Sequence, residues 1–120
     1  MKQEEKELLL KDLCARLPYG VIVTDNRHGN SRITEIDTVE ETVYCDDFDE
    51  YVELDKCKPY IRPMSSMTEE EWKEYRDINC CLTKDCDAWD EVDWLNSHHF
   101  DYRGLIPIGL AIEAPEGMYK

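Results

Sequence analysis

The sequence predicts an α+β fold with an N-terminal helix, a small curved antiparallel sheet, two later helices and an extended C-terminal tail. Three observations predict it. An amphipathic helical pattern opens the chain, four short segments typical of strands follow, and a helix-capping signal precedes two further helical patterns. Because 120 residues leave room for one hydrophobic core, we expect a single domain over residues 1–120.

The first helix is expected over residues 4–17. Its apolar side chains recur on one side at helical spacing, at Leu9, Leu10, Leu13, Cys14 and Leu17. Acids occupy its first turn and Arg16 its last, which suits the helix dipole. Since a proline disfavours helical geometry at the residue before it, Pro18 is expected to end the helix.

Strands are expected over residues 19–24, 32–37, 42–45 and 50–54, with a turn at residues 25–30. Ile33 and Ile36 break strict alternation, which indicates a bulge, a strand end or a strand seen from both faces. An SH3-like barrel is one way to close this antiparallel meander, with residues 54–63 leading to its last strand. Pro59 and Pro63 make that last segment extended and exclude it from being a central strand throughout.

The second helix has a complete start signal. Thr68 is the expected N-cap, Glu71 completes a capping box, and Met67 is placed to pack on Trp72. This helix is expected to reach residue 82 or 83. Asp87 is the expected cap of a third helix, with Trp89, Val92, Leu95 and His99 on one side, an exit turn at Arg103 and Gly104, and a strand or extended tail over residues 105–120.

The chain is strongly acidic. It has 28 Asp and Glu against 14 Lys and Arg, a net charge of −14, which disfavours direct binding to nucleic acid and to anionic membranes. Residues 35–55 contain ten acids and no Lys or Arg. Such a run is either a solvated face or a docking surface for a basic partner. The candidate partner-binding residues are Glu40, Glu41, Asp46, Asp47, Asp49, Glu50 and Trp94, the last because it lies off the apolar side of its helix.

The N-terminus is charged and no apolar segment approaches membrane-spanning length, so a cytoplasmic location is expected. The six cysteines are then expected to be reduced thiols: Cys14, Cys45, Cys57, Cys80, Cys81 and Cys86. Three of these, Cys80, Cys81 and Cys86, lie near His98 and His99 in a way that invites a zinc site. The paired C-x-x-C pattern is absent, however, so neither a metal nor a cofactor is expected.

Two adjacent histidines raise the question of catalysis. His98 and His99, with Asp101 and Tyr102 beside them, are the candidate catalytic residues, but no nucleophile stands in a recognisable motif. Capping of a helix C-terminus is the simpler role for the histidines. Arg103 is similarly expected to pair with Asp101 or Asp93 as a structural clasp.

The segments KPYIRPMSSMTEEE (58–71) and DWLNSHHFDYRGLI (93–106), with GLAIEAPEGMYK (109–120) and LCARLPYGV (13–21), resemble a family of short uncharacterised proteins encoded in gut bacteria and on their prophages and mobile elements. The resemblance implies a phage-related setting and supplies no catalytic residue. Together with the charge, it favours a non-enzymatic protein-binding module whose partner is a basic surface of a host or phage protein. Two alternatives stay open: a nucleic-acid mimic that inhibits a nucleic-acid-binding protein, and a small enzyme that uses the two histidines.

Overall fold

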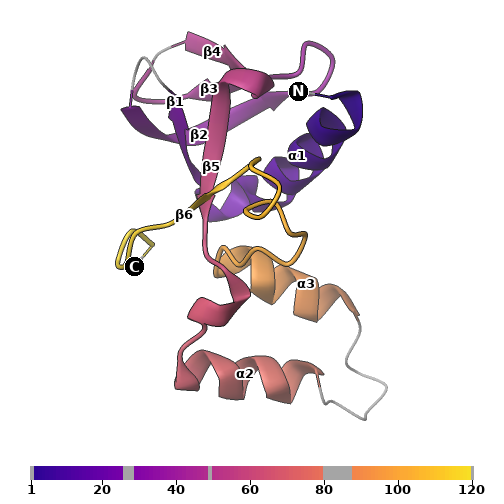
Figure 1. Cartoon of the computed structure of the whole chain (residues 1–120), viewed down its shortest axis with the longest axis vertical. Coiled ribbons are helices and arrows are strands. Elements are labelled where there is room, and N and C mark those ends of the chain that lie inside the picture. Colours follow the sequence, from indigo (N-terminus) through magenta and orange to yellow (C-terminus); the bar gives the residue numbers. More distant parts are fainter. Residues whose placement is uncertain (1, 26–28, 49, 80–87, 120) are drawn as a thin grey trace.

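The computed structural model describes residues 2–25, 29–48, 50–79 and 88–119 (Figure 1). Within these residues the chain forms three α-helices: α1 (Gln3–Arg16), α2 (Glu69–Asn79) and α3 (Ala88–Ser97). One sheet contains the six strands β1 (Ile22–Asp25), β2 (Gly29–Asp37), β3 (Thr42–Cys45), β4 (Glu50–Glu53), β5 (Cys57–Ile61) and β6 (Ile112–Glu113). The predicted α+β class is confirmed.

The sheet has the strand order β4-β3-β2-β1-β5-β6. Its pairs are antiparallel except for β5 and β6, which run parallel. The register of β2 against β3 shifts between Ile33 and Glu35, which agrees with the bulge, one of the three interpretations of the broken alternation. Pro59 pairs with Val23 of β1, while β6 reaches only Tyr60 and Ile61 of β5, so the proline lies where just one side of β5 is paired.

The predicted closure into a barrel is wrong, because β4 and β6 stand at the two edges of an open sheet. After β4 the chain makes a 3₁₀ turn at Leu54–Lys56 and enters β5. β5 then pairs with β1 rather than with β4. A seam therefore remains between β4 and β5.

Helix α1 confirms the predicted segment but not its whole apolar side. Leu9 and Leu13 are fully buried, whereas Cys14 is exposed. Leu17 keeps helical angles, with φ −50° and ψ −46°, and Pro18 lies inside a 3₁₀ turn at Leu17–Tyr19. The expected effect of Pro18 on Leu17 is therefore wrong, and the first strand begins three residues later than predicted.

Helix α1 also carries two buried charged residues, which the sequence pattern did not predict. Asp12 and Arg16 both have zero exposure. Arg16 donates to Asp12 through Nε at 2.8 Å and Nη2 at 3.1 Å, and Nη2 also donates to the carbonyl of Phe100. Arg103 donates to Asp12 at 3.2 Å, so the predicted pairing of Arg103 with Asp101 or Asp93 is wrong.

The start of α2 is as predicted. The amide of Thr68 donates to Glu71 Oε1 at 2.9 Å, and the amide of Glu71 donates to Thr68 Oγ1 at 3.2 Å, which completes the capping box. Trp72 is 56% exposed, so it stays outside the buried core. The structure describes α2 as far as Asn79 and α3 from Ala88. The predicted end of α2 at residue 82 or 83 and the predicted cap at Asp87 lie outside the described residues.

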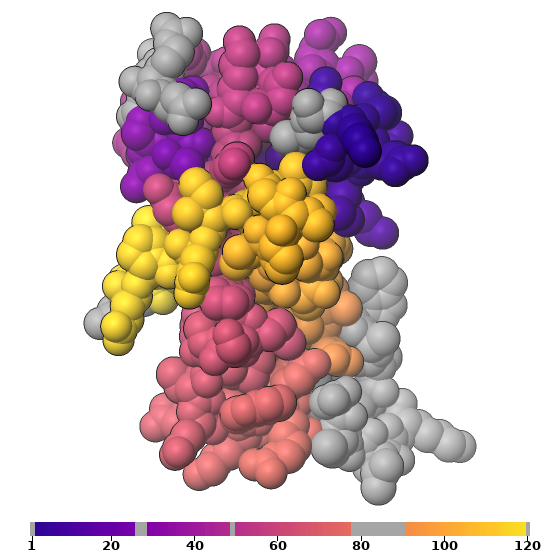
Figure 2. Space-filling view, in the orientation of Figure 1, coloured from indigo at the N-terminus to yellow at the C-terminus, as the bar shows by residue number. Residues whose placement is uncertain are grey.

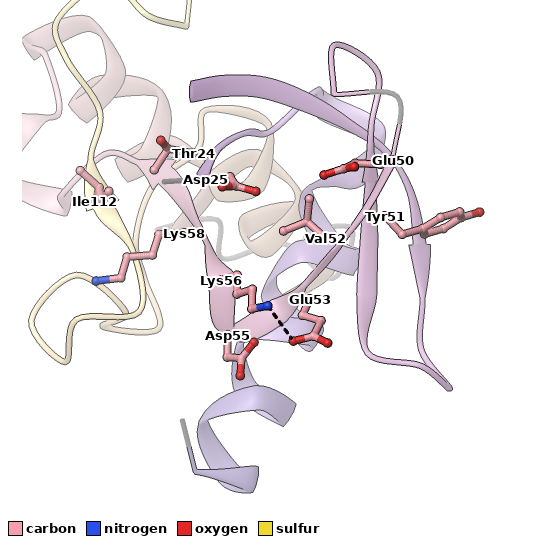
Figure 3. A pocket seen from close by; sticks show the side chains of 10 residues that line it. All are labelled: Thr24, Asp25, Glu50, Tyr51, Val52, Glu53, Asp55, Lys56, Lys58 and Ile112. Carbon is pink, nitrogen blue, oxygen red and sulfur yellow. Dashed lines mark ion pairs between the residues drawn. The ribbon is translucent and has the colours of Figure 1, made fainter. Parts of the chain in front are cut away.

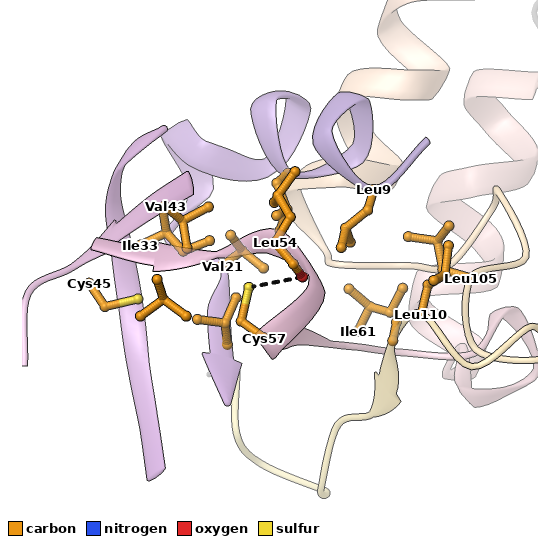
Figure 4. Close-up of a cluster of buried hydrophobic side chains, with 14 residues drawn as sticks. Leu9, Val21, Ile33, Val43, Cys45, Leu54, Cys57, Ile61, Leu105 and Leu110 are labelled. Carbon is orange, nitrogen blue, oxygen red and sulfur yellow. Dashed lines mark hydrogen bonds between the residues drawn. The ribbon is translucent and has the colours of Figure 1, made fainter. Parts of the chain in front are cut away.

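The core fills the space between α1 and the sheet, and the tail closes one end of it (Figure 4). Leu9, Val21 and Ile61 join it with Leu105 and Leu110 of the tail. Figure 2 shows the C-terminal segment lying across the junction between the sheet and the pair of helices α2 and α3. Among the described residues, no helix is long and apolar enough to span a bilayer.

The buried charges give a stability prediction. Replacing Asp12 by Asn leaves the guanidinium of Arg16 buried without its carboxylate, which is expected to lower the free energy of unfolding by about 3–5 kcal/mol. Urea denaturation measures this change. Glu7→Gln, at an exposed position of the same helix, is the control and is expected to change stability by less than about 0.5 kcal/mol. Equal losses in the two variants would contradict the assignment.

Candidate functional site

The acidic residues of the predicted docking surface fall on different parts of the sheet. Two cross-strand rows face away from the core: Glu35 with Tyr44 and Tyr51, and Asp37 with Thr42 and Glu53. The turn between β2 and β3 carries Glu40 and Glu41, and the turn after β3 carries Asp46 and Asp47. Asp49 lies outside the described residues. The acids therefore surround the β2–β4 half of the sheet instead of lining one row.

A groove of about 630 Å³ lies along the open seam beside β4 (Figure 3). Its lining includes four carboxylates and two lysines: Asp25, Glu50, Glu53, Asp55, Lys56 and Lys58. Glu50 and Val52 point toward the groove, while Tyr51 points to the other face. Nζ of Lys56 lies 3.7 Å from Oε2 of Glu53. Because both side chains are more than 60% exposed, this ion pair adds little stability.

Trp94, the remaining predicted partner-binding residue, is half-buried between the two later helices. Its ring stacks on Tyr75 at 5.6 Å, on His98 at 4.1 Å and on Phe100 at 5.7 Å. Its indole N–H donates to Glu74 at 3.2 Å. Trp94 thus lies off the apolar side of α3, as predicted, and contacts α2 there.

A second hollow, of about 330 Å³, lies where β1, β2, the end of α3 and the C-terminal segment meet. It is lined chiefly by polar groups and rings: Tyr19, Arg32, Arg62, Glu71, Ser97, His98, His99 and Tyr119. Two of the four predicted catalytic residues, His98 and His99, therefore share one cavity. We call it the arginine–histidine cavity.

His98 caps the end of α3, as predicted. Its Nδ1 lies 2.9 Å from the carbonyl of Trp94, and because a carbonyl only accepts, this nitrogen carries the hydrogen. Ser97 Oγ also donates to that carbonyl, at 2.8 Å, although it lies 3.1 Å from the His98 ring nitrogen. The serine hydroxyl is thus directed to the backbone and is not activated as a nucleophile.

His99 does not continue α3 as predicted. It takes the left-handed conformation, with φ 61°, and its amide donates to the carbonyl of Asn96. Its ring is 4% exposed and stacks on Tyr119 at 3.7 Å, and its Nδ1 has no hydrogen-bond partner in the described structure. Burial, together with Arg16, the neighbouring His98 ring, Arg62 and Arg32, lowers the pKa of His99 from 6.5 to about 4.

Asp101 and Tyr102 face away from the arginine–histidine cavity. Asp101 accepts hydrogen bonds from the amides of Leu105 and Ile106, at 2.8 and 3.0 Å, and so closes the exit turn. Tyr102 donates to Asn96 at 3.0 Å and accepts from Arg103 at 2.7 Å. The four residues proposed from sequence are therefore split between two places.

Arg62 and Glu71 form one wall of the cavity. Arg62 makes two hydrogen bonds of 2.7 Å to the carboxylate of Glu71, and its guanidinium lies 4.3 Å from the centre of the Phe100 ring. The hydrogen bond from Arg62, opposed in part by burial, lowers the pKa of Glu71 from 4.5 to about 2. Glu71 thus serves both the cap of α2 and the contact of α2 with the end of β5.

Sequence reasoning missed Arg32, Arg62 and Tyr119 as cavity residues. One signal was present for Arg32. Counting outward from the β1–β2 turn pairs Ile22 with Arg32, which brings the arginine close to Gly20. Tyr119 carried no such signal, because it meets Ile22 and Tyr60 from 97 and 59 residues away.

The described residues include three free cysteines. Cys14 is exposed, and burial raises the pKa of Cys45 to about 11 and of Cys57 to about 12, so these two remain thiols at neutral pH. Cys80, Cys81 and Cys86 lie outside the described residues, and with them the zinc hypothesis. Elsewhere in the described part of the chain, no three histidine, cysteine or acidic side chains are placed to hold a metal ion.

Comparisons with protein-family models, with curated proteins and with solved structures found no match to this chain. The geometry of the two hollows is therefore the basis for a functional assignment.

His99 predicts a loss of stability in mild acid. Between pH 6.5 and 4 the unfolded chain binds a proton that the folded chain does not, so the free energy of unfolding falls by up to about 3 kcal/mol across this range. Asn tolerates the left-handed conformation and does not titrate, so His99→Asn is expected to flatten this part of the profile. Urea denaturation at a series of pH values measures it. Parallel profiles for the two proteins would contradict the prediction.

Glu71 predicts a second loss at lower pH. Its folded pKa of about 2 lies below the ordinary 4.5, so its contribution is present above pH 4.5 and is lost as pH falls toward 2. Glu71→Gln is expected to cost about 1–3 kcal/mol at neutral pH and little at pH 2. Thermal unfolding followed by circular dichroism at both pH values tests this. The neighbouring exposed Glu70→Gln is the matched control, and an equal effect there would refute the role of the Arg62 contact.

Proposed function

We propose that the protein is a non-enzymatic protein-binding module that adds an extended, basic segment of a partner protein to the edge of β4. The observation that carries this proposal is the open edge of β4 beside a groove lined by four carboxylates. The resemblance of the chain to phage-related proteins of gut bacteria supports a host or phage protein as that partner.

The backbone of β4 supplies the first element of recognition. From Glu50 to Glu53 the strand pairs with β3, and within the described residues no strand pairs with its other side. An exposed strand edge is a template on which an extended peptide forms backbone hydrogen bonds, and the flanking side chains give specificity. Since β4 has only four residues, such an addition is short and depends on those side chains.

Charge supplies the second element. Asp25, Glu50, Glu53 and Asp55 lie around the groove, and the whole chain carries a net charge of −14. Complementary charge raises the rate of encounter and rejects partners of like charge. Lys56 and Lys58 border the same groove, which favours a segment with a few basic residues over a polycation.

The two alternatives have less support. A nucleic-acid mimic requires acids in a row that resembles a duplex, whereas these acids occupy two faces and two turns around β2–β4. An enzyme that uses His98 or His99 with Asp101 and Tyr102 requires the four side chains in one place, and the last two contact Leu105, Ile106 and Asn96 instead. A protein-binding role uses the features that are present.

The test uses a fluorescein-labelled peptide of eight residues that alternates lysine with valine. Saturable binding, measured by fluorescence anisotropy, is expected at low salt and is expected to weaken as salt is raised. Amide hydrogen exchange in β4 is expected to slow when the peptide is bound, because the strand edge becomes hydrogen-bonded. A peptide that alternates glutamate with valine is expected not to bind.

Charge reversal identifies the surface. Glu53→Lys with Asp55→Lys is expected to weaken binding about tenfold or more, because both acids border the groove. The control is Glu70→Lys with Asp77→Lys, the same charge change at exposed positions of α2, at the opposite end of the molecule (Figure 1). The proposal fails if the lysine peptide does not bind, if both double variants weaken binding equally, or if exchange in β4 is unchanged.

A further inference from the structure

We propose that the arginine–histidine cavity binds a small oxyanion, a phosphate or carboxylate group, with Arg32 as its counter-ion. The cavity measures about 330 Å³ and lies apart from the groove beside β4, with which it shares no lining residue. This inference is therefore independent of the proposed protein-binding function.

Arg32 is placed on the cavity by a glycine. Gly20 has φ 74°, and a Cβ at this position would lie 2.9 Å from Nε and 3.2 Å from Cζ of Arg32. The left-handed conformation favours glycine here, and the absence of a Cβ leaves room for the flexible end of Arg32. The guanidinium thus lies directly against the backbone of residue 20.

Arg32 is an exposed residue of β2, and no carboxylate in the described part of the chain pairs with it. The other two arginines near His99 each have a carboxylate partner, because Arg16 is paired with Asp12 and Arg62 with Glu71. Asp46 and Asp47 share a neighbouring hollow with Arg32, yet neither lies within ion-pair distance of it. Arg32 also makes no side-chain hydrogen bond to any described residue, so the N–H donors on the side of the guanidinium away from Gly20 remain for a ligand.

His99 is the second, independent observation. Its ring is nine-tenths or more buried, lines the same cavity and leaves Nδ1 without a hydrogen-bond partner. The groups that lower its pKa are Arg16 of α1, Arg32 of β2, Arg62 after β5 and His98 beside it, and the ring of Tyr119 stacks on it. Glu71 of α2 is the one carboxylate in the lining of the cavity, and it is paired with Arg62. The depressed pKa of His99 reflects, after burial, this positive surrounding, which an anion would offset.

The walls suit a small ligand with a fixed position. Tyr119 is held by hydrogen bonds of its hydroxyl to the carbonyl of Tyr60 and from the amide of Ile22, at 2.6 and 2.9 Å. Because Tyr119 holds the His99 ring by stacking, this side of the cavity is set before a ligand arrives. A guanidinium matches the paired oxygens of a phosphate or carboxylate, which defines the ligand class.

The test titrates inorganic phosphate and, separately, acetate into the full chain at pH 7 with chloride as the background salt. The ring signals of His99 in carbon-edited NMR spectra are the readout. Saturable shifts are expected with at least one of the two anions, and which one binds more tightly identifies the phosphate or the carboxylate class. Bound anion is also expected to raise the pKa of His99 above about 4, since it stabilises the imidazolium.

Three variants assign the site. Arg32→Gln is expected to weaken anion binding about tenfold, because it removes a charged hydrogen-bond donor. Arg32→Lys keeps the charge but loses the two-pronged donor, so an intermediate loss is expected. Arg76→Gln, at an exposed position of α2 outside the cavity, is expected to leave binding unchanged.

An unchanged thermal midpoint shows that the Arg32→Gln variant is folded. If that variant is unfolded, the anion affinity of Arg32→Lys tests the role of Arg32 instead. The proposal is overturned if neither anion gives a saturable shift, if the Arg32 variants bind as tightly as the unsubstituted protein, or if Arg76→Gln weakens binding as much as they do.

Discussion

The buried guanidinium of Arg16 connects helix α1 to the turn that follows α3. It lies between Asp12 on its own helix and the carbonyl of Phe100, 84 residues further along the chain. The desolvation of two charges is costly, and it is offset here by a two-point contact and by a further bond from Arg103. These contacts fix the turn after α3 on α1. Because His99 belongs to this turn, they also fix its position.

The same turn is fixed from its other side by the end of β5. Arg62 donates its amide to the carbonyl of His99 and accepts from the amide of Asp101, both at 2.7 Å. Its side chain crosses the Phe100 ring to reach Glu71 at the start of α2. Arg62 thus contacts the sheet, helix α2 and the turn after α3. The arginine–histidine cavity lies between these elements.

Local signals were predictable and distant ones were not. The capping box of Thr68 and Glu71 and the third strand depend on neighbours in sequence, and both were found. The irregularity after Ile33 depends on one hairpin register, and a bulge was one of its three expected causes. The open seam, the buried Asp12–Arg16 pair and the cavity depend on partners dozens of residues away. His98 kept its predicted capping role because that role is local, whereas the left-handed turn at His99 separated it from Asp101 and Tyr102. Adjacency in sequence therefore did not bring the four side chains together.

Net charge alone is a coarse guide to the ligands of a protein. A charge of −14 weighs against an extended polyanion, which would meet many acidic side chains at once. A small anion is different, since at physiological ionic strength exposed charges are screened over about 8 Å. Within that distance the cavity presents an arginine that lacks a carboxylate partner in the described residues and a neutral, buried imidazole. The acidic composition and an anion-binding cavity are therefore compatible, because the first acts over the whole surface and the second over a few ångströms.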